Sequence, residues 1–352
     1  MRKESLTFLK KLLSTPSPSG FESKIQKVCK DYAAPHVDEV YKDVHGNQFH
    51  VKNSNRKLRI MLAGHIDEIA LMVNHIDSSG FLGFQAIGGV DPSVLDGQRV
   101  QLHTEEGALP GVIGRRAIHL TDAADRGKGM KMHQMWIDIG AKSKKEAERH
   151  VAIGDPATMD VTHLELLNGR MVARAMDDRI GAFVVLEVMR LIANKKIDCA
   201  VFGVTTVQEE IGMRGATTSA YGCDPHAGIA VDVSHATDHP DVDSKRHGYF
   251  ELDAGPMISR GPNINPKIAK QLFAIAKRKK IPHQAEAAPR STGTDANTMQ
   301  LSRGGVATGL VSVPNRYMHS PVEMVSLKDA ENCAKLLAEW VLTLKSTTSF
   351  IP

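Results

Sequence analysis

The chain has 352 residues, of which 42% are hydrophobic and 24% are charged, and its formal net charge is +4. This composition is ordinary for a soluble globular protein, and the length fits two domains, or one large domain with an insertion. Basic residues are scattered without an interleaved aromatic stripe and no run of about 18 apolar residues occurs, so neither nucleic-acid binding nor a membrane span is expected.

The N-terminal part of the chain predicts two helices and then a buried strand. Apolar residues recur at helical spacing in Leu6–Leu13 and in Ile25–Tyr32, whereas Arg59–Gly64 is a short continuous apolar run. The first 14 residues intersperse charged and apolar side chains, which does not fit a signal peptide, and we expect a cytoplasmic location. The four cysteines are too far apart in sequence for a metal knuckle or a redox pair and are expected to be buried free thiols.

Between about Ala70 and His163 the sequence predicts a small inserted β domain. Short β-like runs alternate there with glycine-rich turns. A polar stretch, Asp122–Lys131, is predicted as a mobile loop. The β-like runs are Val100–His103, Gly111–Gly114 and Met135–Ile139.

After Arg170 helical and strand-like segments alternate, which predicts a parallel sheet. Helices are expected at Arg179–Ile192, Pro266–Lys279 and Ser326–Leu344, and strands at Cys199–Val207, Gly228–Val233 and Val306–Val313. Strands that alternate with helices form sheets covered on both faces. The predicted fold class is therefore α/β: a mixed, mainly parallel sheet with helices on both faces, plus the small inserted β domain.

Histidines and carboxylates recur where the predicted strands end. In open α/β sheets ligands bind outside the carboxyl ends of the strands. His65 and Asp67 follow the first strand and point to the same side, so Asp67 could accept the second ring N–H of His65. The other candidates are Asp177-Asp178 before a helix, Glu209-Glu210 after a strand, Asp232 in an apolar run, and His319 in a loop.

Each of these segments, taken alone, also has an ordinary structural explanation. Asp177-Asp178 could cap the following helix, and Asp232 could cap a turn. His65 could lie in a polar loop, Glu209-Glu210 in an exposed turn, and His319 could be structural. The whole set is more specific, because two histidines, three carboxylates and a spare glutamate are what a two-metal hydrolase needs.

Over essentially its whole length the chain resembles the M42 family of metallo-aminopeptidases, which includes tetrahedral aminopeptidases of archaea and bacterial glutamyl aminopeptidases. The resemblance is carried by six motifs in this order: Gly64–Ile69, Ala173–Gly181, Val207–Gly212, Val231–Asp238, Gly293–Ala296 and His319-Ser320.

The resemblance implies two divalent metal ions, zinc being expected and cobalt the alternative. Asp177 would bridge them, His65 and Asp232 would complete one site, and Glu210 and His319 the other. Two catalytic residues are implied as well: Glu209 as general base and acid, and Asp67 as the group that orients His65.

The resemblance also implies a domain division and an assembly. Residues 1–69 and 164–352 would form the catalytic domain, and residues 70–163 the β domain used for dimerisation. Dimers would assemble into hollow tetrahedral dodecamers that act on short peptides. The Asp177–Asp178 peptide bond is expected to be cis, and Asp178 departs from the Asn that relatives often carry there.

Two other activities fit parts of the pattern. A hydrolase of acylated amino acids would use the same metals. A glycosidase would use a carboxylate pair, but neighbouring residues such as Glu209 and Glu210 project oppositely on extended chain, and two Trp and five Tyr offer little surface for sugar stacking. The preferred N-terminal residue of the substrate does not follow from the sequence.

Overall fold

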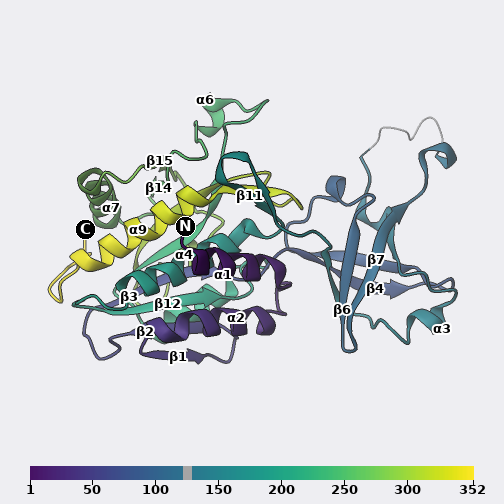
Figure 1. The fold of residues 1–352 in the computed structure, drawn as a ribbon, viewed down its shortest axis with the longest axis horizontal. Helices are drawn as coiled ribbons and strands as arrows, with labels where there is room; N and C mark the ends of the chain where they lie inside the picture. The colour runs from purple at the N-terminus through teal and green to yellow at the C-terminus, as the bar shows by residue number, and fades with distance from the viewer. Residues whose placement is uncertain (122–128) are drawn as a thin grey trace.

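A computed structural model describes residues 1–121 and 129–352 of the chain. Most of Asp122–Lys131, predicted as a mobile loop, lies outside these residues. A large body of sheet and helices carries a smaller β-barrel beside it (Figure 1). The helices are α1 (Lys3–Ser14), α2 (Ser23–Ala33), α3 (Lys144–Ala147), α4 (Met176–Ile192), α5 (Arg214–Cys223), α6 (Ser244–His247), α7 (Pro266–Lys279), α8 (Asp295–Met299) and α9 (Leu327–Thr343).

The large sheet is mixed, and its centre is parallel. Strands β12, β3, β13 and β16 pair in parallel at the centre, as do β14 and β15 at its side, while the outer strands pair antiparallel. The order β1-β2-β12-β3-β13-β16-β17-β11-β10 confirms the predicted fold class, with parallel pairing confined to these strands. The strands are β1 (Glu39–Lys42), β2 (Gln48–Lys52), β3 (Arg59–His65), β10 (Leu164–Leu166), β11 (Arg170–Ala173), β12 (Ala200–Thr206), β13 (Ala227–His235), β14 (Met257–Arg260), β15 (Gln284–Ala287), β16 (Ala307–Arg316) and β17 (Glu323–Ser326).

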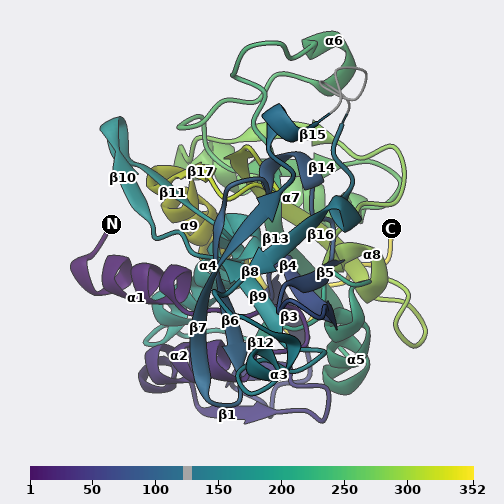
Figure 2. The ribbon, with the colours of Figure 1, turned by 90° about the vertical axis from the view of Figure 1, so that its right-hand side faces the viewer.

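Helices cover both faces of this sheet. In Figure 2, α1, α2 and α9 lie on one side of β3 and β12, and α5 and α8 lie on the other. Helix α4 is apolar on nearly all sides and is buried between the sheet and α9, where Phe183 and Leu186 join the main core. On the opposite face, α5 packs through the small residues Ala216 and Ala220. Such a face gives little hydrophobic periodicity, which is why the sequence did not predict α5.

The inserted segment forms a closed six-stranded barrel in the order β4-β5-β8-β7-β6-β9. The predicted β-like runs fall on three of its strands, and its interior is filled by apolar side chains such as Leu71, Val100 and Ile137. Its strands are β4 (Ala70–Ile76), β5 (Leu82–Ile87), β6 (Arg99–Thr104), β7 (Gly107–Arg115), β8 (Met135–Asp138) and β9 (Pro156–Met159).

The four cysteines are buried free thiols, as predicted. In the described part of the chain, no helix combines the length and the apolar composition that crossing a bilayer requires.

Candidate metal centre

Six of the seven predicted site residues meet in one cleft at the carboxyl edge of the central strands. His65 ends β3, Asp232 lies near the end of β13, and Glu209 and Glu210 follow β12. Asp177 lies at the start of α4, and His319 in the turn between β16 and β17. The cleft has a volume of about 460 Å³ and is lined by all six of these residues.

Asp177 lies between the two histidines. Its Oδ1 is 3.1 Å from Nε2 of His65, and its Oδ2 is 3.3 Å from Nε2 of His319. The Asp177–Asp178 bond is cis, as predicted. The two distances show that the two oxygens of the Asp177 carboxylate face two different imidazoles, an arrangement suited to a bridging ligand.

Within residues 1–121 and 129–352, two groups of side chains bring ligand atoms within 4.8 Å of one another: His65 with Asp177 and Glu210, and His65 with Asp178 and Asp232. Asp178 was not predicted as a ligand; its Oδ1 accepts the N–H of Gly181 at 3.0 Å. Imidazole and carboxylate together are the donor set that zinc and similar divalent metals use.

Two buried oxygens of this cluster, Oδ2 of Asp178 and Oε1 of Glu210, have no hydrogen-bond partner within the described residues. Burial, and then the charge of Asp177, raises the pKa of Glu210 and of Asp232 well above the ordinary range. Buried carboxylates crowded in this way are stabilised by a cation, which supplies the missing positive charge. The residues present therefore fit divalent metal ions.

The pKa values of both histidines of the cleft are raised as well. Burial lowers the pKa of His65, but the hydrogen bond to Asp177 and the close carboxylates of Asp67 and Glu209 outweigh it, so the pKa is raised well above its ordinary value. The hydrogen bond to Asp177 raises the pKa of His319 to about 9. Burial raises the pKa of Glu209 to about 8.

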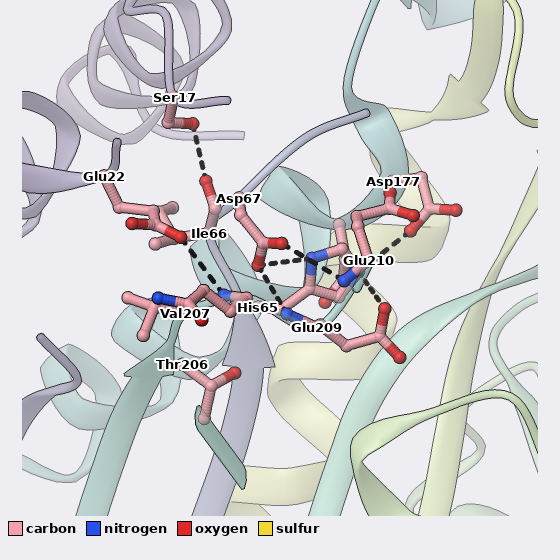
Figure 3. A network of polar contacts seen from close by, with 12 residues as sticks. Ser17, Glu22, His65, Ile66, Asp67, Asp177, Thr206, Val207, Glu209 and Glu210 are labelled. Atoms are coloured by element: carbon pink, nitrogen blue, oxygen red, sulfur yellow. Dashed lines mark hydrogen bonds and ion pairs between the residues drawn. The ribbon is translucent and has the colours of Figure 1, made fainter. Parts of the chain in front are cut away.

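Asp67 lies behind the cleft and connects two of the segments that form it (Figure 3). Its Oδ1 is 3.4 Å from Nδ1 of His65, an ion-pair distance. Its two oxygens also accept the backbone N–H groups of Glu209, at 3.0 Å, and Glu210, at 3.1 Å. This carboxylate therefore holds the end of β3 against the segment that follows β12.

Two further groups hold His319, and neither was predicted from the sequence. The buried carboxylate of Glu323 accepts the backbone N–H of His319 at 2.7 Å and that of Asp177 at 3.0 Å. The carbonyl oxygen of Gly89, in the barrel loop after β5, is 2.8 Å from Nδ1 of His319. A carbonyl carries no sequence signal, and the only hint of Glu323 is its place four residues after His319.

The chain matches the M42 glutamyl aminopeptidase family over residues 46–336. It is 40% identical over 341 residues to the lysyl aminopeptidase of Pyrococcus furiosus, covering 96% of each chain. Among solved structures, the TET aminopeptidase of a marine sediment thaumarchaeon superposes with a TM-score of 0.93 at 34% identity, over 97% of each chain. The TET1 peptidase of Pyrococcus horikoshii superposes with a TM-score of 0.87 at 30% identity, over 97% of this chain and 100% of that one.

Fold and sequence together define a hydrolase that acts on peptide bonds, an aminopeptidase. The chain belongs to the M42 glutamyl aminopeptidase family.

Proposed function

We propose that the chain is a dinuclear metal-dependent aminopeptidase that removes N-terminal residues from short peptides. The observation that carries the proposal is the carboxylate of Asp177, whose two oxygens face two different imidazoles. One ion would be held by His65, Asp177 and Asp232, and the other by Asp177, Glu210 and His319. Zinc is the proposed metal, with cobalt as the alternative. When bound, such ions polarise a carbonyl and lower the pKa of water from about 15.7 to about 7.

Glu209 is the proposed general base and acid. Its Oε2 lies 3.9 Å from Nε2 of His65, at the wall of the cleft, without being part of either ligand group. It would take a proton from the attacking water at a carboxylate oxygen and then deliver it to the leaving amine. Asp67 would orient His65 and hold Glu209 and Glu210 by their backbone N–H groups.

The domain division and the assembly are part of the proposal. Residues 1–69 and 164–352 would form the catalytic domain, and the barrel within residues 70–163 would form the dimerisation domain. The Pyrococcus horikoshii relative can assemble into a tetrahedron or a large octahedral shell. We propose a tetrahedral dodecamer built from dimers for this chain also, and a cytoplasmic location.

Removal of metal tests the proposal directly. Dialysis against a strong chelator should abolish hydrolysis of aminoacyl chromogenic substrates, and zinc or cobalt should restore it, because carboxylates alone activate water poorly. Full turnover by protein shown to be metal-free would contradict the dinuclear mechanism.

Two neighbouring glutamates test the assignment of roles. Glu209→Gln keeps the shape of the side chain but removes the base, so kcat should fall about 10²–10⁴-fold while metal content is retained. Glu210→Gln should instead weaken one metal site, and excess zinc should partly restore activity. Metal analysis and kinetics on both variants decide between them. The reverse pattern, with metal lost only in Glu209→Gln, would show the roles to be wrong.

A further inference from the structure

A second hollow, of about 360 Å³, opens beside the metal centre. Strand β13 carries Asp232 into the centre, and the next residues of the same strand, Ser234 and His235, line the hollow. Burial, and then the charge of His319, lowers the pKa of His235, while the carboxylates of Asp177 and Glu286 act against this lowering. Groups of the centre and of the hollow therefore both act on His235, and the hollow begins at Ser234, two residues along the strand from Asp232.

The hollow contains a carboxylate that lacks a cation. Oε1 of Glu286 accepts the hydroxyl of Ser234 at 2.6 Å, and Oε2 accepts the hydroxyl of Ser259 at 2.7 Å. Over residues 1–121 and 129–352 no lysine or arginine pairs with it. The nearby Arg260 is instead directed at the ring of Phe273, 5.6 Å from its centroid. Two hydroxyls thus fix the direction of the Glu286 carboxylate. Three histidines, His235, His239 and His247, also line the hollow, but among the described residues none of them is within ion-pair distance of this carboxylate.

A narrower pocket also borders the metal centre, and its carboxylates differ from Glu286 in their partners. It is lined mainly by apolar residues of the barrel and its junction, such as Val94 and Leu95. Of its four carboxylates, Glu68 is paired with Arg174 at 2.8 Å and with Arg179, and Glu323 accepts two backbone N–H groups. The other two, Asp177 and Glu210, are proposed metal ligands. A cationic side chain therefore finds a better partner in Glu286 than in this pocket.

We propose that the hollow receives the side chain of the substrate's N-terminal residue and that Glu286 selects a basic one, lysine or arginine. The methylene stem would pack against Phe250 and Val242, which line the hollow, and the ammonium or guanidinium group would bind the carboxylate. This specificity rests on the proposed aminopeptidase function, because it places the scissile bond at the metal centre.

Kinetics on a matched pair of variants test the role of Glu286. Metal-loaded wild type should hydrolyse lysyl and arginyl p-nitroanilides with a higher kcat/KM than leucyl or glutamyl ones. Glu286→Gln should lower kcat/KM for the basic substrates about 10–100-fold, mainly through KM, because a hydrogen bond to a charged group is lost. Leucyl hydrolysis should stay within about threefold. Glu251→Gln is the control, since that exposed carboxylate contacts Tyr249 and does not line the hollow.

A binding experiment separates this specificity from catalysis. In calorimetry, wild type should bind L-lysine more tightly than L-norleucine, its apolar counterpart of similar length, and Glu286→Gln should abolish the difference. If no aminoacyl substrate is hydrolysed but lysine binding still depends on Glu286, the proposed function fails and the hollow's selectivity stands. A wild-type preference for leucine or glutamate, or an equal loss on all substrates in Glu286→Gln, would overturn the selectivity. Should Glu286→Gln not fold, Glu286→Asp should keep the preference for basic residues with weaker binding.

Discussion

Glu323 is a buried residue that holds the proposed bridging ligand from behind. A single buried carboxylate accepts backbone N–H groups from Asp177 and His319, which are 142 residues apart in sequence but adjacent in the cleft. Because Glu323 binds the backbone of both residues, it fixes the positions from which the two side chains extend into the cleft. A residue that holds metal ligands in place affects metal affinity although it does not contact the metal itself.

We predict that Glu323→Gln weakens metal binding about 10–100-fold, because an amide has one acceptor oxygen where the carboxylate has two. Titration against a competing chelator measures the affinity. Asp329→Asn is a matched control: that buried carboxylate also accepts two backbone N–H groups, from Asp253 and Gly255, neither of which is a proposed ligand. Equal metal affinity in the two variants would contradict the prediction.

The sequence predicted the proposed ligands better than the residues that hold those ligands in place. His65, Asp177 and Asp232 could be found because each follows or precedes a strongly apolar segment, and because strand ends converge at one edge of a sheet. Asp178 was expected beside the site but not as a member of a ligand group. Glu323 was missed because its role depends on two N–H groups distant in sequence, and no local pattern encodes such a contact.

At the scale of elements, the loop after β5 connects the barrel to the metal centre. A Cβ on Gly88 would meet Cβ of Glu210 at 3.2 Å, and one on Gly89 would meet Nδ1 of His319 at 3.0 Å. Glycine at these positions lets the backbone approach two proposed ligands. The barrel therefore forms part of the wall of the centre.

We predict that Gly89→Ala lowers kcat/KM about 10–100-fold, because the added methyl group displaces the His319 ring from the carbonyl that orients it. Steady-state kinetics and metal analysis on the purified variant measure the effect. Gly222→Ala is the control, since a Cβ there, in α5, meets nothing within 4 Å. Equal activity of the two variants would show that the loop merely lies near the centre.

Strand β2 contains a buried histidine that should make stability depend on pH. Burial lowers the pKa of His50 to about 3, and neither ring nitrogen has a partner within the described residues. Between pH 3 and about 6.5 only the unfolded chain binds this proton. Because protonation then favours the unfolded chain, the contribution of neutral His50 to the free energy of unfolding is fully present above pH 6.5 and is lost as pH falls toward 3.

When pH falls from 7 to 5.5, the free energy of unfolding of His50→Leu should therefore decrease by about 1 kcal/mol less than that of wild type. Urea unfolding at the two pH values measures the difference. The exposed His133→Leu should behave like wild type and also controls for any loss of metal at the lower pH. An unchanged pH dependence in His50→Leu would mean that His50 is protonated in the folded protein.

Helices and strands with a clear hydrophobic pattern were predicted with nearly correct bounds, whereas elements without such a pattern were not predicted. Helix α7 matches its predicted bounds, and α9 and the four central strands differ by one or two residues at most ends. Barrel closure was not predicted, because it depends on the pairing of β4 with β9, which are distant in sequence. Short elements such as α8 have too few residues to establish a period.

At the scale of the whole molecule, the proposed assembly is the property to measure. Several large apolar side chains of the barrel and the adjoining segment are exposed, including Val112, Ile118 and Ile153. We predict that light scattering at working concentration gives a mass that is a multiple of 38.4 kDa, with dimers and dodecamers the expected species. A single species at the chain mass over the accessible concentration range would count against the assembly.

The insertion of the barrel between β3 and the later strands also sets an order of events during synthesis. His65 leaves the ribosome 112 residues ahead of Asp177, and the barrel strands emerge between them. At about 5–20 residues per second this interval lasts roughly 6–22 s, long enough for a small barrel to fold. His319 emerges 230 residues after Gly89, by which time the barrel has had time to place the carbonyl that orients its ring. The proposed metal site that includes His319 is therefore completed against a wall that folds before its last ligand is made.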